Sequence, residues 1–380
     1  MSEYNIEGFV DDRFAAVREA FEANFASGKD VGASFCATVE GEVVVDLWGG
    51  WVDEEKSAPW EEDTIVNVYS STKTVTALTA LMIADRGELD FQAPVAKYWP
   101  EFAANGKAGV TVGHLMSHAA GLPGWKEPIT TEDLYDWDKA CALLAAQAPM
   151  WEPGTASGYH AISQGYLVGE VIRRITGKSV GTVFREEIAE PLGAEFWIGL
   201  PASEDDKVAT LIPPPPAPPA NPDSPKSEIQ TAMSNPAIDV SATRSRAWRG
   251  AEIPAAGGTA NARGIATVHK ILANGGVADG KRFMSEAGCR KALELQIEGT
   301  DLVFGTKARF GLGFGLAGGL VPLPSPNSLY WGGYGGSLVL IDLDKKTSFG
   351  YAMNKMGGGT TGDTRAFSLA MAMWAGLGLM

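Results

Sequence analysis

Residues with strand character are concentrated at the two ends of this chain, and this distribution most constrains the fold. Two β-rich runs around a short glycine-containing turn, within residues 34–48, predict a hairpin. The last hundred residues again favour strands, whereas the middle of the chain carries helical patterns and loops. We therefore predict an α/β sheet domain built from residues 1–87 and 241–380, into which residues 88–240 are inserted as a mainly helical domain.

A proline-rich stretch, residues 212–226, interrupts the end of the predicted insertion. Proline has no backbone N–H and a fixed φ, so this stretch cannot be a helix interior or a central strand. We expect a surface loop of polyproline II character. A ligand for a proline-binding domain is the alternative interpretation.

Charge and composition narrow the classes of protein. The formal net charge is −15, which argues against nucleic acid and anionic membrane surfaces as partners. No apolar run reaches the length of a membrane span, and the first residues lack the features of a secretion signal. The three cysteines are scattered and odd in number, so we expect reduced core residues. Together these features predict a cytoplasmic protein.

The pattern Ser70-x-x-Lys73 lies where an extended segment, residues 64–68, becomes an apolar helix. Side chains at i and i+3 lie on the same face of a helix, so the lysine amine can reach the serine hydroxyl. Free N–H groups at a helix N-terminus favour a developing oxyanion. The helix looks like a core helix, and a lysine near a core loses hydration and becomes a usable base. The pattern is short, and a helix cap with a solvated lysine is the alternative.

Two later motifs could contribute to the same site. Tyr159 stands on a glycine-containing loop just before a predicted helix, where a phenol can be presented to a site. Trp331-Gly332-Gly333 lies between two strand signals, and glycines there allow close approach of a ligand to the backbone. A packed aromatic residue and a β-bulge are the structural alternatives.

Taken together, these motifs resemble the three signatures of serine β-lactamase-fold enzymes, in the right order. Intervening segments also match, including residues 87–102 and 112–123, so the resemblance runs from about residue 32 to residue 354. The chain most resembles the class C β-lactamase-related carboxylesterases, also called family VIII esterases. The resemblance implies a β-lactamase/penicillin-binding-protein-like fold, an antiparallel sheet flanked by helices plus an inserted helical domain.

The resemblance also implies roles for particular residues. Ser70 would be the nucleophile, with Lys73 and Tyr159 sharing its proton and returning it to the leaving alkoxide. Which of these two groups acts first as base stays open, because coupled groups titrate as a unit. The backbone N–H groups of Ser70 and Tyr334 would form the oxyanion hole. The expected substrate-binding residues are Trp331, Gly332, Gly333, Tyr334, Trp125 and His160.

The chain departs from the family pattern in the third motif and beside the tyrosine. β-Lactamases usually carry a lysine or histidine where this chain has Trp331, and an asparagine or serine where it has Ala161. Both changes remove polar groups that recognise a β-lactam. An uncharged ester is therefore the favoured substrate, and no metal or organic cofactor is needed.

Two other motifs are expected to be structural. Gly177-Lys-Ser179-Val-Gly matches a nucleophile elbow, but a helix rather than a strand precedes it, so we expect Ser179 to cap the next helix. His114 and His118 have a spacing that suits a metal on a helix, but no third ligand is evident. We expect no metal site there.

We therefore predict a serine carboxylesterase that hydrolyses short-chain, apolar esters through a Ser70 acyl-enzyme. A β-lactamase, a D-amino-acid peptidase or amidase, and an acyltransferase on the same fold are the alternatives. A non-catalytic binding protein is the alternative from a different class. The expected partner is a small-molecule ester, and the sequence leaves the oligomeric state open.

Overall fold

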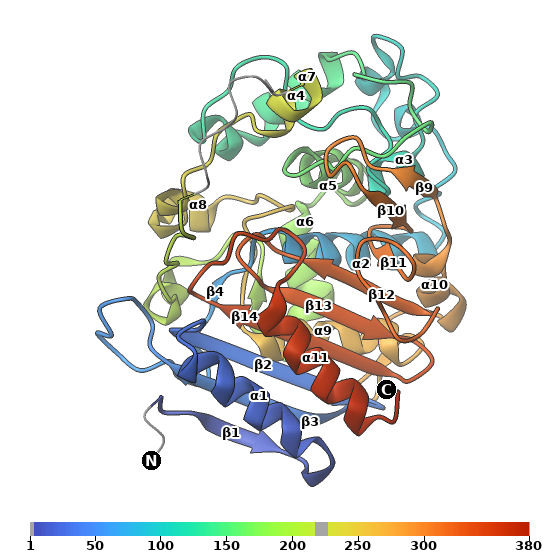
Figure 1. Ribbon diagram of the computed structural model, residues 1–380. Coiled ribbons are helices and arrows are strands. Elements are labelled where there is room, and N and C mark those ends of the chain that lie inside the picture. Colours follow the sequence, from blue (N-terminus) through green and yellow to red (C-terminus); the bar gives the residue numbers. More distant parts are fainter. Residues whose placement is uncertain (1–3, 217–226, 380) are drawn as a thin grey trace.

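A nine-stranded antiparallel sheet forms the centre of the fold, in a computed structural model that describes residues 4–216 and 227–379 (Figure 1). Strands from both ends of the chain meet in it, because β2 pairs with β14. In spatial order its strands are β1 (Glu7–Val10), β3 (Glu42–Gly50), β2 (Gly32–Val39), β14 (Thr347–Met353), β13 (Leu338–Asp342), β12 (Ser328–Gly332), β11 (Gly315–Leu316), β10 (Lys307–Phe310) and β9 (Ile297–Thr300).

Smaller sheets and eleven α-helices complete the described part of the chain. A three-stranded sheet has the order β4 (Val66–Asn67), β6 (Thr259–Ala260) and β5 (Phe196–Trp197), and β7 (Val277–Ala278) pairs with β8 (Lys281–Arg282). The helices are α1 (Ala15–Ala26), α2 (Thr72–Asp85), α3 (Val112–Met116), α4 (Trp137–Ala146), α5 (Ser163–Thr176), α6 (Val180–Phe184), α7 (Glu228–Met233), α8 (Arg246–Gly250), α9 (Ala262–Ala273), α10 (Glu286–Arg290) and α11 (Thr364–Gly376).

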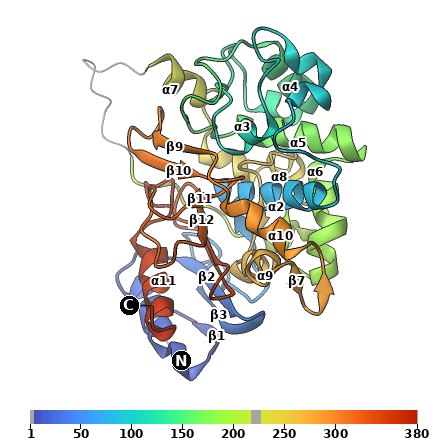
Figure 2. The same cartoon turned by 90° about the vertical axis from the view of Figure 1, so that its right-hand side faces the viewer.

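Helices cover both faces of the large sheet. Helices α1 and α11 lie side by side on one face, and α9 packs on the other face against β2, β13 and β14 (Figures 1 and 2). Strands β12, β13 and β14 are consequently buried along their whole length. This explains why their sequences are apolar at successive positions rather than alternating.

The hairpin at the start of the chain is confirmed. Strands β2 and β3 are joined by Glu40 and Gly41, both with positive φ, at 52° and 89°. Two successive residues with positive φ suit the right-handed twist of the paired strands, and glycine adopts this conformation without steric cost. The turn therefore fixes the register in which the first two long strands of the sheet pair.

In the middle of the chain, the regular secondary structure of the described residues is mostly helical. Between residues 88 and 240 the described part holds α3 to α7 and one two-residue strand, β5. Helices α3, α4, α5 and α7 lie together at the end of the molecule away from β1 (Figure 1). Strand β5 pairs with β6, so this segment is also joined to the sheet part. The division into two domains stays a prediction.

Other sequence predictions concern single features of the fold. Most of the proline-rich stretch, residues 217–226, lies outside the described residues. The cysteines Cys36, Cys141 and Cys289 are buried and free, as expected. Among the helices that the structure describes, none has the length and apolar character needed to cross a bilayer.

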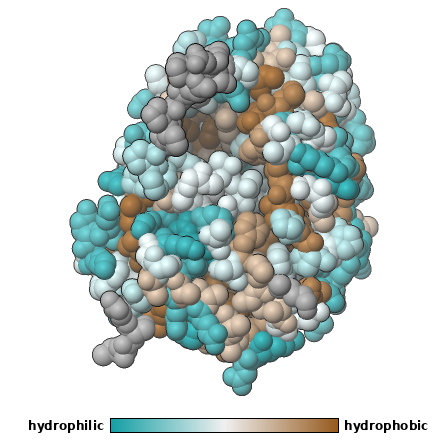
Figure 3. Space-filling model, in the orientation of Figure 1, coloured by the Kyte–Doolittle hydropathy of each residue, from teal (hydrophilic) through white to brown (hydrophobic). Residues whose placement is uncertain are grey.

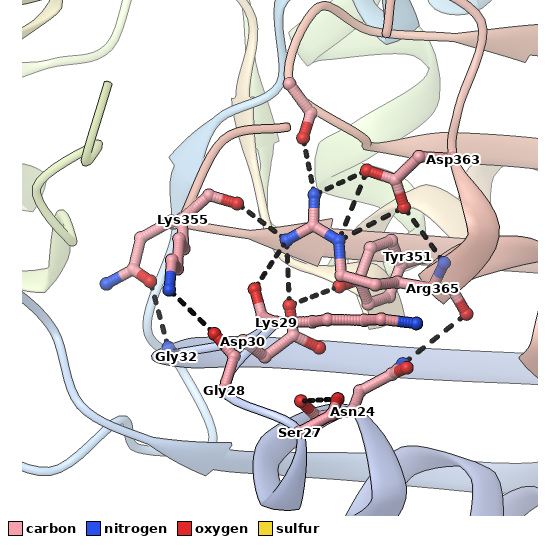
Figure 4. Close-up of polar contacts among 12 residues, drawn as sticks. Asn24, Ser27, Gly28, Lys29, Asp30, Gly32, Tyr351, Lys355, Asp363 and Arg365 are labelled. Atoms are coloured by element: carbon pink, nitrogen blue, oxygen red, sulfur yellow. Dashed lines mark hydrogen bonds and ion pairs between the residues drawn. The ribbon is translucent and has the colours of Figure 1, made fainter. Parts of the chain in front are cut away.

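A buried ionic network ties α11 to the sheet (Figure 4). Arg365, at the start of α11, forms ion pairs with Asp30 at 2.9 Å and with Asp363 at 2.6 Å. The same guanidinium donates to the carbonyl of Gly335 at 2.6 Å, and Tyr351 of β14 donates to Asp30 at 2.7 Å. Because Arg365 is only 3% exposed, its charge depends on these partners. The network therefore connects the segment before β2, strand β14 and the turn after β12.

Replacing the arginine should destabilise the fold strongly. Arg365→Met leaves Asp30 buried without its cation, so we expect a loss of about 3–5 kcal/mol in the free energy of unfolding. Urea denaturation followed by circular dichroism measures this loss. Arg290→Met is the matched control, because Arg290 pairs with Glu286 and Asp344 at the exposed surface and should cost less than about 1 kcal/mol. Equal losses for the two variants would contradict this account.

Candidate active site

Ser70 lies in a strained turn between a short strand and a buried helix. Strand β4 ends at Asn67, a 3₁₀ turn covers Tyr69–Ser71, and α2 begins at Thr72. Tyr69 has a φ of +42°, a conformation that costs free energy for a residue with a side chain. The turn presents the Ser70 hydroxyl at the N-terminal end of α2, where backbone N–H groups are free and the helix dipole is positive.

Lys73 is buried beside Ser70 on the first turn of α2. Its Nζ lies 3.1 Å from the Ser70 Oγ and donates to the carbonyls of Ala161 at 2.6 Å and Ala255 at 2.9 Å. The residue is 1% exposed, and the described residues contain no carboxylate that forms an ion pair with it. Burial holds the pKa of Lys73 well below its usual range. The amine can therefore be neutral and act as a base towards Ser70.

Tyr159 approaches Ser70 from the segment that precedes α5. Its hydroxyl donates a hydrogen bond to the Ser70 Oγ at 2.6 Å, and the Lys73 Nζ lies 4.9 Å from the centre of its ring. Burial raises the pKa of Tyr159 to about 12, although the hydrogen bond to Ser70 acts in the opposite direction. The phenol is therefore protonated at neutral pH. The Ser70 hydroxyl is thus in contact with a potential base, Lys73, and a potential acid, Tyr159.

The turn after β12 is fastened to the Ser70 turn. The Ser337 hydroxyl donates to the Val68 carbonyl at 2.8 Å and lies 2.9 Å from the Ser71 hydroxyl. A Cβ at Gly333 would lie 2.2 Å from the same Val68 carbonyl, so only glycine allows this approach. Within the described residues, the backbone N–H groups of Ser70 and Tyr334 have no hydrogen-bond acceptor. Both N–H groups are therefore available for a ligand.

An apolar cavity of about 590 Å³ opens over Ser70. No charged side chain is among the described residues that line it. Apart from Ser70, Tyr69 and Tyr159, its larger lining side chains are Ile162, Met233, Ile238, Val303, Phe304 and Tyr334. In the view of Figure 3, apolar residues gather in a hollow between the helical part and the sheet part of the molecule. A cavity of this size and character fits a small uncharged molecule.

Trp331 occupies a different place from the one its motif suggests. The sequence predicts a substrate-binding residue, but Trp331 is 3% exposed and does not line the cavity. Its ring stacks on His118 at 5.3 Å and lies 5.8 Å from the Tyr159 ring. The indole Nε1 is buried and has no hydrogen-bond partner among the described residues, so the contact with Tyr159 is between the two rings. Trp331 therefore supports the tyrosine from behind.

Trp125 and His160 also lie outside the lining of the cavity. Trp125 is fully buried, donates to the Ala140 carbonyl at 3.0 Å and borders a neighbouring cavity. His160 is fully buried, and its Nε2 accepts a hydrogen bond from the Leu122 N–H at 3.1 Å. Successive side chains of an extended segment point in opposite directions, so His160 turns away from the site that Tyr159 enters.

Ser179 and His114, which lie in the two remaining motifs, both take part in helix caps. Ser179 is the N-cap of α6 and hydrogen-bonds Glu252, and Gly177 ends α5 in the left-handed conformation. His114 takes part in the capping box of α3. No group of three or more potential metal-ligating side chains lies together in the described part of the chain.

The sequence missed the apolar walls of the cavity. Val303 and Phe304 come from the turn between β9 and β10, and Met233 and Ile238 come from α7 and the segment after it. These residues lie in no motif, and each reaches the site only through the tertiary fold. No local signal in the sequence could have identified them.

A serine in contact with a buried lysine and a buried tyrosine, under an uncharged cavity, has the groups that nucleophilic acyl transfer uses. The sequence matches the family model described as Beta-lactamase over residues 17–372. The chain belongs to this family.

Individual relatives agree with this assignment. Esterase/beta-lactamase LipL of Mycobacterium tuberculosis is 39% identical over 294 residues, which cover 73% of this chain and 67% of LipL. Esterase EstB of Burkholderia gladioli is 29% identical over 197 residues, which cover 47% of this chain and 50% of EstB. The chain thus spans about two thirds of the length of LipL and half of the length of EstB.

Solved structures confirm the fold. The crystal structure of a family VIII carboxylesterase matches with a TM-score of 0.93 at 44% identity, covering 98% of this chain and 100% of that one. A penicillin-binding protein homologue from Caulobacter crescentus matches with a TM-score of 0.91 at 40% identity, with the same coverage. The predicted β-lactamase/penicillin-binding-protein-like fold is therefore confirmed.

The close approach of Gly333 to Val68 can be tested by adding one carbon atom. Gly333→Ala forces the turn away from Ser70 and moves the neighbouring Tyr334 N–H, so we expect Ser70 to react about 10²-fold more slowly with a fluorophosphonate probe. Intact-protein mass spectrometry measures the rate. Gly358→Ala is the control, because a Cβ there meets no described atom within 4 Å. A wild-type rate in folded Gly333→Ala would show that the turn does not assist the serine.

Proposed function

We propose that this chain is a carboxylesterase that hydrolyses small apolar esters through an acyl-enzyme on Ser70. The observation that carries the proposal is the contact of one serine hydroxyl with Lys73 and Tyr159 beneath an uncharged cavity. The chain is a serine hydrolase of the beta-lactamase family acting on esters, as its esterase relatives indicate. This conclusion does not depend on the roles proposed for Lys73 and Tyr159.

Acylation begins with proton transfer from the serine. Neutral Lys73, 3.1 Å from the Ser70 Oγ, accepts the proton while the oxygen attacks the ester carbonyl. The carbonyl oxygen becomes negative and receives hydrogen bonds from the N–H groups of Ser70 and Tyr334. Tyr159, whose hydroxyl contacts the same Oγ at 2.6 Å, donates a proton to the departing alkoxide and regains one from Lys73.

Deacylation uses the same groups in reverse. A water molecule takes the place of the alcohol, loses a proton towards Tyr159 and Lys73, and attacks the acyl carbonyl. The bond to the Ser70 Oγ then breaks, and this oxygen recovers its proton. An alcohol in place of water would give acyl transfer, and the same groups would serve it.

The uncharged lining of the cavity favours an uncharged ester. The third motif places an indole behind Tyr159 rather than a cation beside the substrate. A substrate carboxylate would therefore enter an apolar cavity without a counter-ion, which is costly. β-Lactam hydrolysis is the second candidate function, because LipL carries both activities in its name.

The catalytic roles can be tested by substitution. Ser70→Ala should abolish hydrolysis of a short-chain nitrophenyl ester, because the nucleophile is lost. Lys73→Ala and Tyr159→Phe should each lower kcat by about 10²-fold or more, because general acid–base catalysis typically contributes this much. Steady-state kinetics with nitrophenyl butyrate measures these losses.

Ser179→Ala is the matched control, since Ser179 caps α6 and should leave the rate unchanged. Full activity of Ser70→Ala together with loss in Ser179→Ala would move the nucleophile and reject the proposal. Nitrocefin and D-alanyl peptides, assayed beside nitrophenyl butyrate, separate an esterase from the lactamase and peptidase alternatives. We expect the ester to have the highest kcat/KM.

A further inference from the structure

Asp301 is a buried carboxylate that contacts the segment of Tyr159 from another part of the chain. It directly follows β9 and begins the turn to β10. Its Oδ1 accepts the backbone N–H of Tyr159 at 3.3 Å, of Val303 at 2.9 Å and of Phe304 at 3.0 Å. The Tyr159 N–H has no other acceptor among the described residues. One oxygen atom thus holds the backbone of the tyrosine and the turn together.

The same turn also holds the ring of the tyrosine. The Phe304 ring stacks on the Tyr159 ring at 4.9 Å with an interplanar angle of 21°. The Leu302 N–H donates to the Ser157 carbonyl at 2.8 Å, which adds a second link between the turn and the tyrosine segment. Since Asp301 fixes the N–H of Phe304, its carboxylate restrains Tyr159 at the backbone and, through Phe304, at the ring.

Burying the Asp301 carboxylate costs more free energy than a purely structural link between two segments requires. Asp301 is fully buried, no cation forms an ion pair with it in the part of the chain that the structure describes, and its Oδ2 has no hydrogen-bond partner there. Burial raises the pKa of the Tyr159 phenol, the hydrogen bond to Ser70 opposes this, and the charge of Asp301 adds to the effect of burial. Lys73, His118 and the adjoining His160 are the other titratable groups around this tyrosine. The phenol is protonated at neutral pH with or without this charge, so the contacts of the Oδ1 atom carry the argument.

We propose that Asp301 is a positioning residue for Tyr159, which it holds so that the phenol can deliver a proton to the departing alkoxide. The inference rests on the proposed function, in which Tyr159 is the general acid. Asp301 does not line the cavity, so it acts only through the tyrosine and the turn.

The chemistry of the leaving group supplies a specific readout. A nitrophenolate departs at neutral pH without a proton, whereas an ethoxide needs one as the carbon–oxygen bond breaks. A misplaced acid therefore slows hydrolysis of ethyl acetate much more than that of nitrophenyl acetate. General loss of structure would slow both esters alike, so the ratio of the two rates reports the position of the acid.

The experiment compares kcat/KM for these two acetates in Asp301→Ala and Asp301→Asn. Asp301→Ala removes the acceptor. We expect kcat/KM for ethyl acetate to fall at least about tenfold more than kcat/KM for nitrophenyl acetate, which is within the usual range for general acid catalysis. Asp301→Asn keeps an acceptor oxygen at the same place and should restore most of the wild-type ratio. If Asp301→Ala does not fold, Asp301→Glu, which displaces the oxygen, carries the same expectation. Leu302→Ala, an exposed position of the same turn, should match the wild type.

Equal losses for the two esters in Asp301→Ala, or no recovery of the ratio in Asp301→Asn, would overturn the inference. Tyr159→Phe separates this failure from a failure of the proposed function. If Tyr159→Phe shows the selective loss and Asp301→Ala does not, only the role of Asp301 is wrong. If Tyr159→Phe itself shows no selective loss, the assignment of the acid is wrong, and the inference falls with it.

Discussion

The burial of a lysine without a counter-ion is the constraint on which the rest of the site depends. Moving an ammonium group out of water is costly, and the protein offers Lys73 one hydroxyl and two backbone carbonyls in return. The carbonyls belong to Ala161, beside the tyrosine segment, and to Ala255, before β6. The lysine can therefore be accommodated only where α2 meets both segments. The same environment lowers its pKa, so burial also makes the neutral amine, which can accept a proton, available near neutral pH.

Two of the groups that hold Tyr159 lie outside the cavity over Ser70. An indole packs behind the phenol and a buried carboxylate holds its backbone, so neither group faces the cavity. Burial and the charge of Asp301 raise the pKa of Tyr159, whereas the hydrogen bond to Ser70 acts in the opposite direction. The cavity is left uncharged while the tyrosine is still held against Ser70. In the proposed function, selectivity for neutral esters and acid–base chemistry would therefore depend on different residues.

The sequence predicted the features of the fold that depend on local patterns. The apolar helix after Ser70, the hairpin at the start of the chain and the overall fold agree with the structure, because each depends on short-range periodicity or on segments with a strong family resemblance. The orientation of individual aromatic side chains was not predictable in this way. Trp125 and His160 stand near motifs in sequence, but their directions are set by packing, and both are buried away from the cavity.

Residues missed by the sequence share one property. Asp301 and Phe304 reach Tyr159 from a turn more than a hundred positions away in the chain, and only the order of strands in the sheet brings them there. Strand order and loop placement are long-range properties that neither hydrophobic periodicity nor residue spacing encodes. The sequence alone therefore could not predict that the turn between β9 and β10 lies against Tyr159.

In the proposed function, Ser70 carries the acyl group during turnover. Rapid mixing of the protein with nitrophenyl butyrate, acid quench within the first turnover and peptide mass spectrometry test this claim directly. We expect a butyryl group on the peptide that contains Ser70, and its disappearance as the substrate is exhausted. A butyryl group on Ser179, or turnover without any acylated peptide, would contradict it.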